Sequence, residues 1–295
     1  MTVSAAGEEG VVGTAIRVED VGAVRHLVFC RADEFNTITE QLRSELDAAL
    51  DAADADDSIR VVLLRAEGRA FCAGFGLDWS TMAQARGDDV AAQGRVWDTV
   101  ADVRMIGRFG TTFAKLHSIS KPTVAAVQGW CVAGGTDMIF NVDMIVAGES
   151  ARFGYPPARV WGIPEAPWVW VARLGLERAK RYLFTGDEIT ATEAAAAGMI
   201  LECVPDASLL EHTSALAARM ALLPLNQLRM MKWALNDVAR HQYQPDTSRM
   251  LGFIFDGVAR HTQEGLDFVA RAEDAGWREA VRERDRPFGD YGERS

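Results

Sequence analysis

The sequence predicts a mixed α/β core followed by a helical C-terminal region. Up to Val204, short apolar runs typical of buried strands alternate with amphipathic segments, and two of these runs lead directly into glycine-rich turns. After Pro205 the pattern becomes helical. With 295 residues, of which 48% are hydrophobic and 25% charged, the chain is long enough for one large domain and a smaller appendage.

The first part of the chain predicts a strand, a helix and a second strand. Residues 1–13 are small, polar and acidic, so we expect them to be disordered and place the core at 14–205. A strand is expected at Val24–Cys30, a helix at Thr39–Ala53 and a strand at Ile59–Arg65. The helix has leucines at helical spacing on one face and a threonine able to cap its first turn: Leu42, Leu46, Leu50 and Thr39.

The order of strand, glycine-rich turn and helix recurs further along the core. A polar segment from Trp79 to Leu116 is expected to form mobile helices, and a strand from Pro122 to Val127 follows it. The remaining expected core elements are helices at 136–142, 175–184 and 192–198, strands at 144–147 and 200–204, and an extended segment at 151–154.

The C-terminal region, 206–277, is expected to be helical, and 278–295 form a strongly charged tail. Helices are expected at 209–223, 225–239 and 251–277, because apolar residues recur at helical spacing. The first two of these helices have apolar faces made of Leu216, Met220, Leu223, Leu228, Met231 and Leu235.

Composition excludes several classes of function. A formal net charge of −11 gives no global attraction to nucleic acid or to an anionic membrane. The apolar segments are shorter than the roughly 20 residues that a membrane helix needs. The four cysteines are scattered without paired metal-ligand spacing, and the start does not read as a signal peptide. We therefore expect a soluble, cytoplasmic protein without a metal site.

Two glycine-rich turns, Ala70–Asp78 and Gln128–Asp137, carry the functional signal. Each lies just past the end of an expected strand, where ligands commonly bind. Glycine allows backbone N–H groups to approach a ligand without an intervening side chain. Two such groups that converge can hold a negatively charged oxygen atom.

From about residue 15 to about residue 277 the chain resembles the enoyl-CoA hydratase/isomerase family, the crotonases. The resemblance rests on both turns and on the order and spacing of further segments: Asn36–Ile38, Lys121–Gly135, Asp143–Phe153, Thr185–Asp187 and Ala194–Pro205. It implies an α/β fold in which ββα repeats form a spiral. It also implies that 206–277 is a trimerisation region, and that the protein is a homotrimer or homohexamer.

The resemblance further implies that the protein stabilises the enolate of an acyl-CoA thioester in an oxyanion hole. The two backbone donors fall at Phe75 and Gly134. Coenzyme A enters as part of the substrate, and no prosthetic group is expected. The family positions that contact coenzyme A correspond here to Ala70, Phe71, Ala73, Phe268 and Arg271, the last two facing the nucleotide of a neighbouring subunit.

The catalytic acids are less regular than the turns. Hydratases of the family use two glutamates, whose positions correspond here to Asp137 and Pro157. Proline cannot carry a proton. Glu165 stands at a point where some relatives use an acid, so Asp137 and Glu165 form a candidate pair. Alternatively, Glu165 caps the following helix or pairs with Arg159 or Arg173.

Aromatic side chains near both turns predict the wall of the substrate pocket, together with Pro157: Phe75, Trp130, Tyr155, Trp161, Trp168 and Trp170. Such a wall favours a bulky, cyclic or aromatic acyl group. The predicted function is addition of water to, or movement of, a double bond in an enoyl-CoA. Because Pro157 stands at the position of the second glutamate, two alternatives stay open. Under these alternatives, the protein is an enoyl- or dienoyl-CoA isomerase without hydratase activity, or an acyl-CoA binding protein without catalysis.

Overall fold

The structure is a computed structural model that describes residues 14–76 and 98–291. The expected disordered N-terminus and the last four residues lie outside the described part. So do residues 77–97, which include the end of the first glycine-rich turn and the start of the segment expected to form mobile helices.

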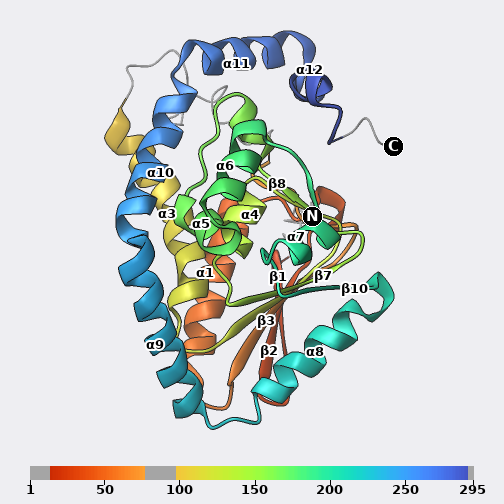
Figure 1. Ribbon diagram of the computed structural model, residues 1–295, viewed down its shortest axis with the longest axis vertical. Helices are drawn as coiled ribbons and strands as arrows, with labels where there is room; N and C mark the ends of the chain where they lie inside the picture. The colour runs from red at the N-terminus through yellow and green to blue at the C-terminus, as the bar shows by residue number, and fades with distance from the viewer. Residues whose placement is uncertain (1–13, 77–97, 292–295) are drawn as a thin grey trace, which may run out of the picture.

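A six-stranded sheet forms the base of the molecule (Figure 1). Its strands, in spatial order, are β1 (Ile16–Val21), β2 (Val24–Phe29), β3 (Val61–Ala66), β5 (Thr123–Val127), β7 (Met144–Gly148) and β10 (Glu202–Val204). Apart from the antiparallel pair β1 and β2, neighbouring strands are parallel. Helices cover both faces, which explains why β3 and β5 read as continuous apolar runs.

A smaller, four-stranded sheet contains β4 (Ala70–Cys72), β6 (Trp130–Val132), β8 (Arg152–Gly154) and β9 (Ile189–Thr190). Its first three strands are parallel, and each follows a strand of the large sheet: β3 precedes β4, β5 precedes β6, and β7 precedes β8. With the helices that follow, this order is the expected spiral of ββα repeats, so the predicted fold class is confirmed. The two segments interpreted as turns each contain a short strand.

Two long helices of the spiral pack beside each other, α1 (Glu40–Ala55) and α3 (Thr99–Ser118). The prediction for α1 is confirmed: its three leucines are fully buried, and the Thr39 side chain accepts a hydrogen bond from the backbone N–H of Leu42 at 3.2 Å. Of the segment expected to form mobile helices, the described part is the single 20-residue helix α3, whose buried face includes Phe109, Phe113 and Leu116.

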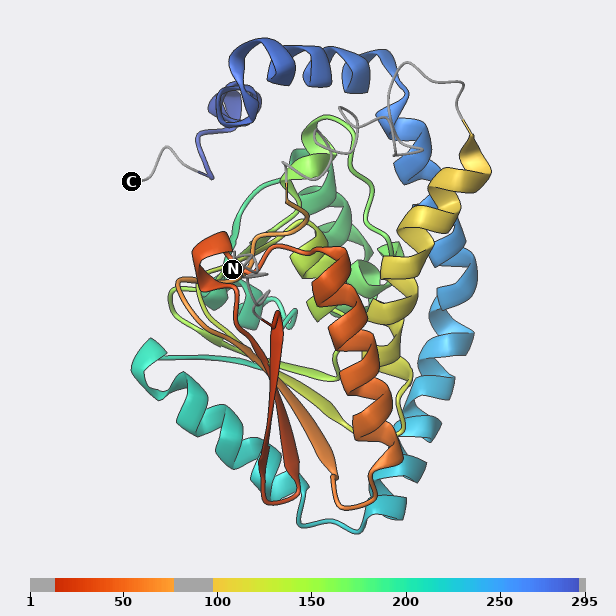
Figure 2. The same cartoon turned by 180° about the vertical axis from the view of Figure 1, so that it is seen from behind.

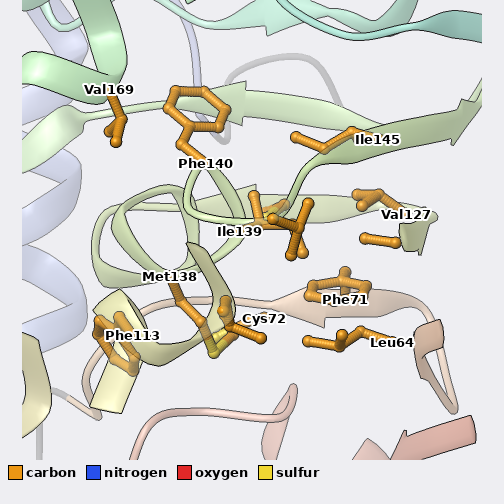
Figure 3. Close-up of a cluster of buried hydrophobic side chains, with 14 of the residues drawn as sticks. Leu64, Phe71, Cys72, Phe113, Val127, Met138, Ile139, Phe140, Ile145 and Val169 are labelled. Atoms are coloured by element: carbon orange, nitrogen blue, oxygen red, sulfur yellow. The ribbon is translucent and has the colours of Figure 1, made fainter. Parts of the chain in front are cut away.

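The shorter helices of the core are α4 (Gly134–Ile139), α5 (Pro167–Leu174), α6 (Leu176–Thr185) and α7 (Ala191–Ala196). Every residue of α4 is buried. Its residues Met138 and Ile139 project into a hydrophobic cluster that also contains Phe71, Cys72 and Phe113 (Figure 3). Packing on all sides fixes the position of this six-residue helix, which is too short to be stable alone.

Five helices make up the C-terminal region: α8 (Leu209–Met220), α9 (Leu225–Tyr243), α10 (Pro245–Arg260), α11 (Gln263–Ala275) and α12 (Trp277–Asp285). Helix α8 packs on β3, β5 and β7, whereas α10 packs along α3 and α5 (Figure 2). The prediction of one helix over 251–277 is wrong, because the chain leaves the helical conformation near His261 and Thr262 caps a new helix.

The residues expected only to form a charged tail make α12 and a 3-10 helix, Arg286–Phe288. Asp285 and Asp290 from this segment pair with Arg159 of the core. Helices α11 and α12 cross one end of the molecule, opposite the turn between β1 and β2 (Figure 1). In 14–76 and 98–291, no helix has the length and apolar character needed to span a bilayer.

We predict that Arg173→Met destabilises the fold by about 3 kcal/mol, because charge-assisted hydrogen bonds to buried acceptors are lost. The Arg173 guanidinium of α5 donates to the carbonyl oxygens of Phe140 and Met199 at 3.0 and 3.3 Å and also to that of Val142, and so fixes the end of α4. Urea denaturation measures the loss. The exposed Arg178→Met is the control, and an equal loss in both variants would contradict the prediction.

Candidate active site

A cavity of about 330 Å³ lies between the smaller sheet, α4 and the C-terminal helices. Several parts of the chain line it, among them α3 through Met105 and Ile106, and three of these parts supply side chains that bear on its chemistry. The glycine-rich turns supply Phe75, Gly134 and Asp137. The loop after β8 supplies Tyr155, Pro157, Trp161 and Glu165, and the C-terminal region supplies Asp256, Val281 and Tyr291.

The two glycine-rich turns touch at this cavity. A Cβ atom built on Gly74 would lie 2.9 Å from the Cβ of Ala133 and 3.3 Å from the backbone nitrogen of Gly134. One built on Gly134 would lie 2.7 Å from ring carbons of Phe75. Glycine at both positions therefore allows the close approach, and the φ of Gly74, +86°, also favours glycine. The structure thus brings together the two predicted oxyanion residues, Phe75 and Gly134.

The second turn ends in an unusual backbone conformation that starts α4. Ala133 has φ 53° and ψ −127°, a region that residues other than glycine rarely adopt. Gly134 is then the first residue of α4, where backbone N–H groups have no acceptor within the helix. This start aims the first turn of α4 at the cavity.

Asp137 lies in α4 and is 1% exposed. Neither of its carboxyl oxygens accepts a hydrogen bond of ordinary geometry from a residue in the described ranges. Burial raises the pKa of Asp137 well above its usual value, and the backbone of Glu165 lowers it only in part. The structure therefore places a carboxyl group of high proton affinity at the cavity.

Glu165 is 3% exposed and lies where α3 and α10 approach the same loop. A Cβ atom built on Gly110 of α3 would lie 3.0 Å from its Oε2 atom, and one built on Gly252 of α10 would lie 2.5 Å from its backbone oxygen. Burial raises the pKa of Glu165 well above its usual value, and the negative charges of Asp137 and Asp256 raise it further. Two glycines on different helices therefore leave the space that this residue fills.

The structural alternatives for Glu165 are not realised. Helix α5 has no side-chain cap, Arg159 pairs with Asp285 and Asp290, and Arg173 donates to backbone carbonyls. Neither oxygen of the Glu165 carboxyl group has a hydrogen-bond partner of ordinary geometry in the described part of the chain. Its side chain therefore faces the cavity, as does Asp137.

Asp256 of α10 is a third acid at the cavity, and sequence reasoning missed it. It pairs with Arg260 at 3.1 Å, and Arg260 also lies 3.6 Å from the buried Asp102 of α3. Burial raises the pKa of Asp256, and Arg260 lowers it. The only sequence signal is the i, i+4 spacing of Asp256 and Arg260, which does not reveal which face of α10 meets the cavity.

Asp137, Glu165 and Asp256 lie in a cavity with few polar groups and cannot all ionise without a large free-energy cost. Asp285 also lines the cavity and is paired with Arg159 and Arg284. Moving a carboxylate out of water is costly unless it is paired, and like charges nearby add to this cost. Asp256 has a cationic partner, Arg260, whereas the pKa values of Asp137 and Glu165 both rise because of burial. Both shifts favour retention of a proton by this pair, an arrangement in which one member can act as an acid while the other acts as a base.

Four of the six aromatic residues predicted for the pocket wall line the cavity: Phe75, Trp130, Tyr155 and Trp161. Trp168 and Trp170 do not. Trp170 is fully buried against Phe140, with ring centroids 4.9 Å apart, and Trp168 packs on His117 and Tyr243. Spacing along the sequence could not show that α5 turns these two rings into the core.

Tyr155 and Pro157 both take part in the loop after β8. The Tyr155 hydroxyl donates a hydrogen bond to the carbonyl oxygen of Ile163 at 2.8 Å. The carbonyl oxygen of Pro157 accepts hydrogen bonds from the backbone N–H groups of Val160, Trp161 and Gly162. Pro157 therefore shapes the loop that ends at Glu165.

The predicted coenzyme A residues fall in two places. Ala70 and Phe71 are buried in β4, whereas Ala73 lines both the cavity and a neighbouring hollow of about 980 Å³. Phe268 packs on Trp161 with ring centroids 5.4 Å apart, and Arg271 forms ion pairs with Asp274 and Glu283 at the surface. Within the described residues, no group of three or more metal-binding side chains is placed to hold a metal ion.

Comparisons with known proteins agree on one family. The family model described as Enoyl-CoA hydratase/isomerase matches residues 19–278. The 2,3-dehydroadipyl-CoA hydratase of Escherichia coli K12 is 32% identical over 202 residues, which cover 68% of this chain and 73% of that protein. The 1,2-epoxyphenylacetyl-CoA isomerase of the same organism is 27% identical over 215 residues, which cover 72% of this chain and 78% of that protein.

The fold matches solved structures over nearly its whole length. The crystal structure of an enoyl-CoA hydratase from Mycobacterium smegmatis has a TM-score of 0.88 and 42% sequence identity, and the match covers 95% of this chain and 96% of that chain. The likeness includes the C-terminal helices as well as the spiral core.

We predict that Asp137→Asn and Glu165→Gln stabilise the protein increasingly as the pH rises. In each case the folded-state pKa lies above the unfolded-state value, so the folded chain keeps a proton that the unfolded chain has released. The stability that this proton provides is complete below the unfolded pKa, near about 4, and is lost as the pH rises towards the folded pKa. The amide variants do not lose this stability as the pH rises, because an amide does not titrate.

For each acid, the difference in the free energy of unfolding between the amide variant and the wild type grows by up to about 1.4 kcal/mol per pH unit within this window. Urea denaturation from about pH 5 to about pH 9 measures it. Asp246→Asn, at an 87% exposed side chain on α10, serves as the control and should show no growing gap. A constant difference at all pH values for the two variants would contradict the assignment.

Proposed function

Since the chain belongs to the enoyl-CoA hydratase/isomerase family, we propose that this cavity is the acyl site of an enzyme that adds water to, or moves, a double bond in an enoyl-CoA thioester. One observation carries the proposal. Two buried carboxyl groups, Asp137 and Glu165, accept no hydrogen bond of ordinary geometry in the described ranges and face a cavity at which the two glycine-rich turns meet. An inert binding protein would gain no stability from such a pair.

In this proposal the thioester oxygen lies between the backbone N–H groups of Phe75 and Gly134. The oxygen gains negative charge as the thioester becomes an enolate, and fixed backbone dipoles stabilise that charge without having to reorganise. The contact between the two turns and the place of Gly134 at the start of α4 support this role. Loss of one such donor typically lowers the rate by about 10² to 10³.

Asp137 and Glu165 would move the protons. In hydration, the ionised carboxyl group takes a proton from water while the water oxygen bonds to the β-carbon. The protonated carboxyl group gives its proton to the α-carbon. In isomerisation, the ionised group removes a proton from the carbon next to the double bond, and a proton is returned at the other end of the shifted bond. Glu165 supplies the second acid that Pro157 cannot, so the site supports both reactions.

The coenzyme A part of the substrate would extend from the cavity into the neighbouring hollow. Ala73 and Trp130 line both spaces, so the two spaces adjoin at these residues. The hollow also contains Arg69, whose guanidinium carbon lies 4.4 Å from the centre of the Phe35 ring, so it offers a cation to phosphate. Contact of Phe268 and Arg271 with a nucleotide held by a neighbouring subunit stays a prediction.

We also propose that α9 contributes to a homotrimer, which pairs into a hexamer in some family members. Large apolar side chains lie exposed along this helix, which a monomer rarely tolerates in such number. Trp233, Leu235 and Val238 are 56%, 71% and 63% exposed. We call the surface made by these three side chains the α9 surface.

For the acids, we predict that Asp137→Asn and Glu165→Gln each lower kcat/KM on enoyl-CoA substrates by at least about 100-fold, because each removes a proton-transfer group. Binding of a saturated acyl-CoA, measured by calorimetry, should be retained. The exposed acid Glu264 of α11 gives a control, Glu264→Gln, with unchanged kinetics. If neither amide change at the cavity lowers turnover, the acid assignment is wrong.

The solvent isotope distinguishes the two reactions. In D₂O a hydratase forms the hydroxyacyl thioester with deuterium at the α-carbon, whereas an isomerase without hydratase activity exchanges hydrogen and moves the double bond with no addition of water. Mass spectrometry of products from straight, branched and aromatic enoyl-CoAs separates these outcomes. Absence of both reactions with every thioester of the panel, combined with tight binding, would instead favour a binding protein.

For the assembly, we predict that the wild-type chain sediments as a trimer or hexamer and that Leu235→Glu with Val238→Glu shifts it to smaller species. Burying two carboxylates in an apolar interface is strongly unfavourable. Leu176→Glu, at a 55% exposed leucine of α6 outside the α9 surface, is the matched control. A monomeric wild-type protein in sedimentation velocity would refute the assembly.

A further inference from the structure

The C-terminal segment returns to the cavity after crossing the end of the molecule. Four of its residues line the cavity: Val281, Arg284 and Asp285 of α12, and Tyr291 beyond the 3-10 helix. This segment, residues 277–291, is called the C-terminal strap below. The sequence suggested only a charged tail, so its role in the cavity comes from the structure.

A buried ion cluster anchors the C-terminal strap to the loop after β8. The Arg159 side chain is 2% exposed, and its Nη1 atom lies 2.9 Å from Asp285 Oδ1 and 2.7 Å from Asp290 Oδ1. Its Nη2 atom donates to Asp290 Oδ2 at 2.8 Å, and its guanidinium carbon lies 3.8 Å from the centre of the Phe288 ring. Removing one partner of a buried, bidentate ion pair costs far more free energy than removing one partner of a surface pair.

The anchor directs Tyr291 into the wall of the cavity. Gly289 and Tyr291 have φ values of +67° and +51°, so the backbone turns sharply inward after the 3-10 helix. The Tyr291 ring lies 5.8 Å from the ring of Trp130, measured between centroids. Its hydroxyl group fits against Gly154, where a built Cβ atom would lie only 1.8 Å from the oxygen. Tyr291 is thus fitted closely between the wall and the glycine.

We propose that the C-terminal strap completes the acyl site and that Tyr291 determines which acyl groups fit, so that compact, branched or ring-bearing acyl groups are preferred over long straight chains. The inference rests on the proposed function of the cavity as an acyl site. Trp130, Trp161 and Tyr291 form a rigid aromatic wall, which accepts a compact group and stops a long chain. The specificity therefore depends on a residue 126 positions from Glu165 along the chain.

Arg159 acts in this proposal as a positioning residue for Tyr291. Without its guanidinium, Asp290 would lose its bidentate partner, whereas Asp285 would keep its pair with Arg284. Removing one partner of a buried ion pair is strongly unfavourable, so Asp290 would move into water and carry the end of the strap, including Tyr291, with it. The wall would then open on the side of Tyr291.

The test compares kcat/KM for straight-chain 2-enoyl-CoAs of increasing length in the full chain. Tyr291→Ala and Arg159→Met should raise the ratio of long-chain to short-chain kcat/KM by about tenfold or more, the scale of discrimination that a few methylene groups provide in an apolar pocket. Tyr291→Phe keeps the ring and should leave the ratio unchanged. Arg282→Met, at a 70% exposed side chain of α12, is the control.

A uniform fall of kcat/KM for all chain lengths in Tyr291→Ala would overturn the proposal, since a purely structural strap gives that result. If Arg159→Met does not fold, the length preferences of Tyr291→Ala and Asp290→Asn still test the proposal. Calorimetry with saturated acyl-CoAs of the same lengths measures the length preference in binding and does not depend on turnover. If the wild-type protein neither binds nor converts any thioester, the proposed function fails; if it does but the variants keep its length preference, only the strap proposal fails.

Discussion

The organisation of this protein depends on the burial of two carboxyl groups, those of Asp137 and Glu165, in one cavity. Each is almost fully removed from water, and neither accepts a hydrogen bond of ordinary geometry within the described ranges. Burial raises the pKa of both, the charge of Asp256 adds to this, and the charge of Asp137 raises the pKa of Glu165 further. This arrangement lowers the stability of the fold, and the proposed function assigns proton transfer to the pair.

Several features of the scaffold make sense as conditions for this pair. Gly110 and Gly252 leave the space for Glu165 on helices that otherwise pack closely. Helix α4 is held by packing on all sides and by Arg173 at its end, which fixes the position of Asp137. The contact between the two glycine-rich turns brings the start of this same helix beside Phe75. The acids and the proposed oxyanion donors therefore share one rigid support.

The sequence predicted those parts of the molecule that depend on local pattern. The parallel strands read as apolar runs because both faces of the sheet are covered, and α1 followed from its leucines and its Thr39 cap. The fold class and the family followed from motifs in order. The positions of Asp137 and Glu165 at one cavity agree with their selection as a pair, although their roles stay predictions.

What the sequence could not predict depends on contacts between distant segments. Asp256 and Tyr291 reach the cavity only because α10 and the C-terminal strap fold back over the core, and a sequence pattern does not show such a return. Trp170 is aromatic and close in sequence to the site, yet α5 turns it into the core. Likewise, β4 and β6 are strands because they pair with each other, not because of their own residues.

The central claim concerns the proton shared by Asp137 and Glu165, and carbon-13 NMR of the labelled carboxyl groups tests it most directly. Spectra of the wild-type protein, assigned with Asp137→Asn and Glu165→Gln, report the protonation state of each group as the pH changes. The account predicts that at neutral pH one of the two gives the signal of a protonated acid and loses its proton only at higher pH. Titration of both groups at ordinary values, near about 4, would contradict it.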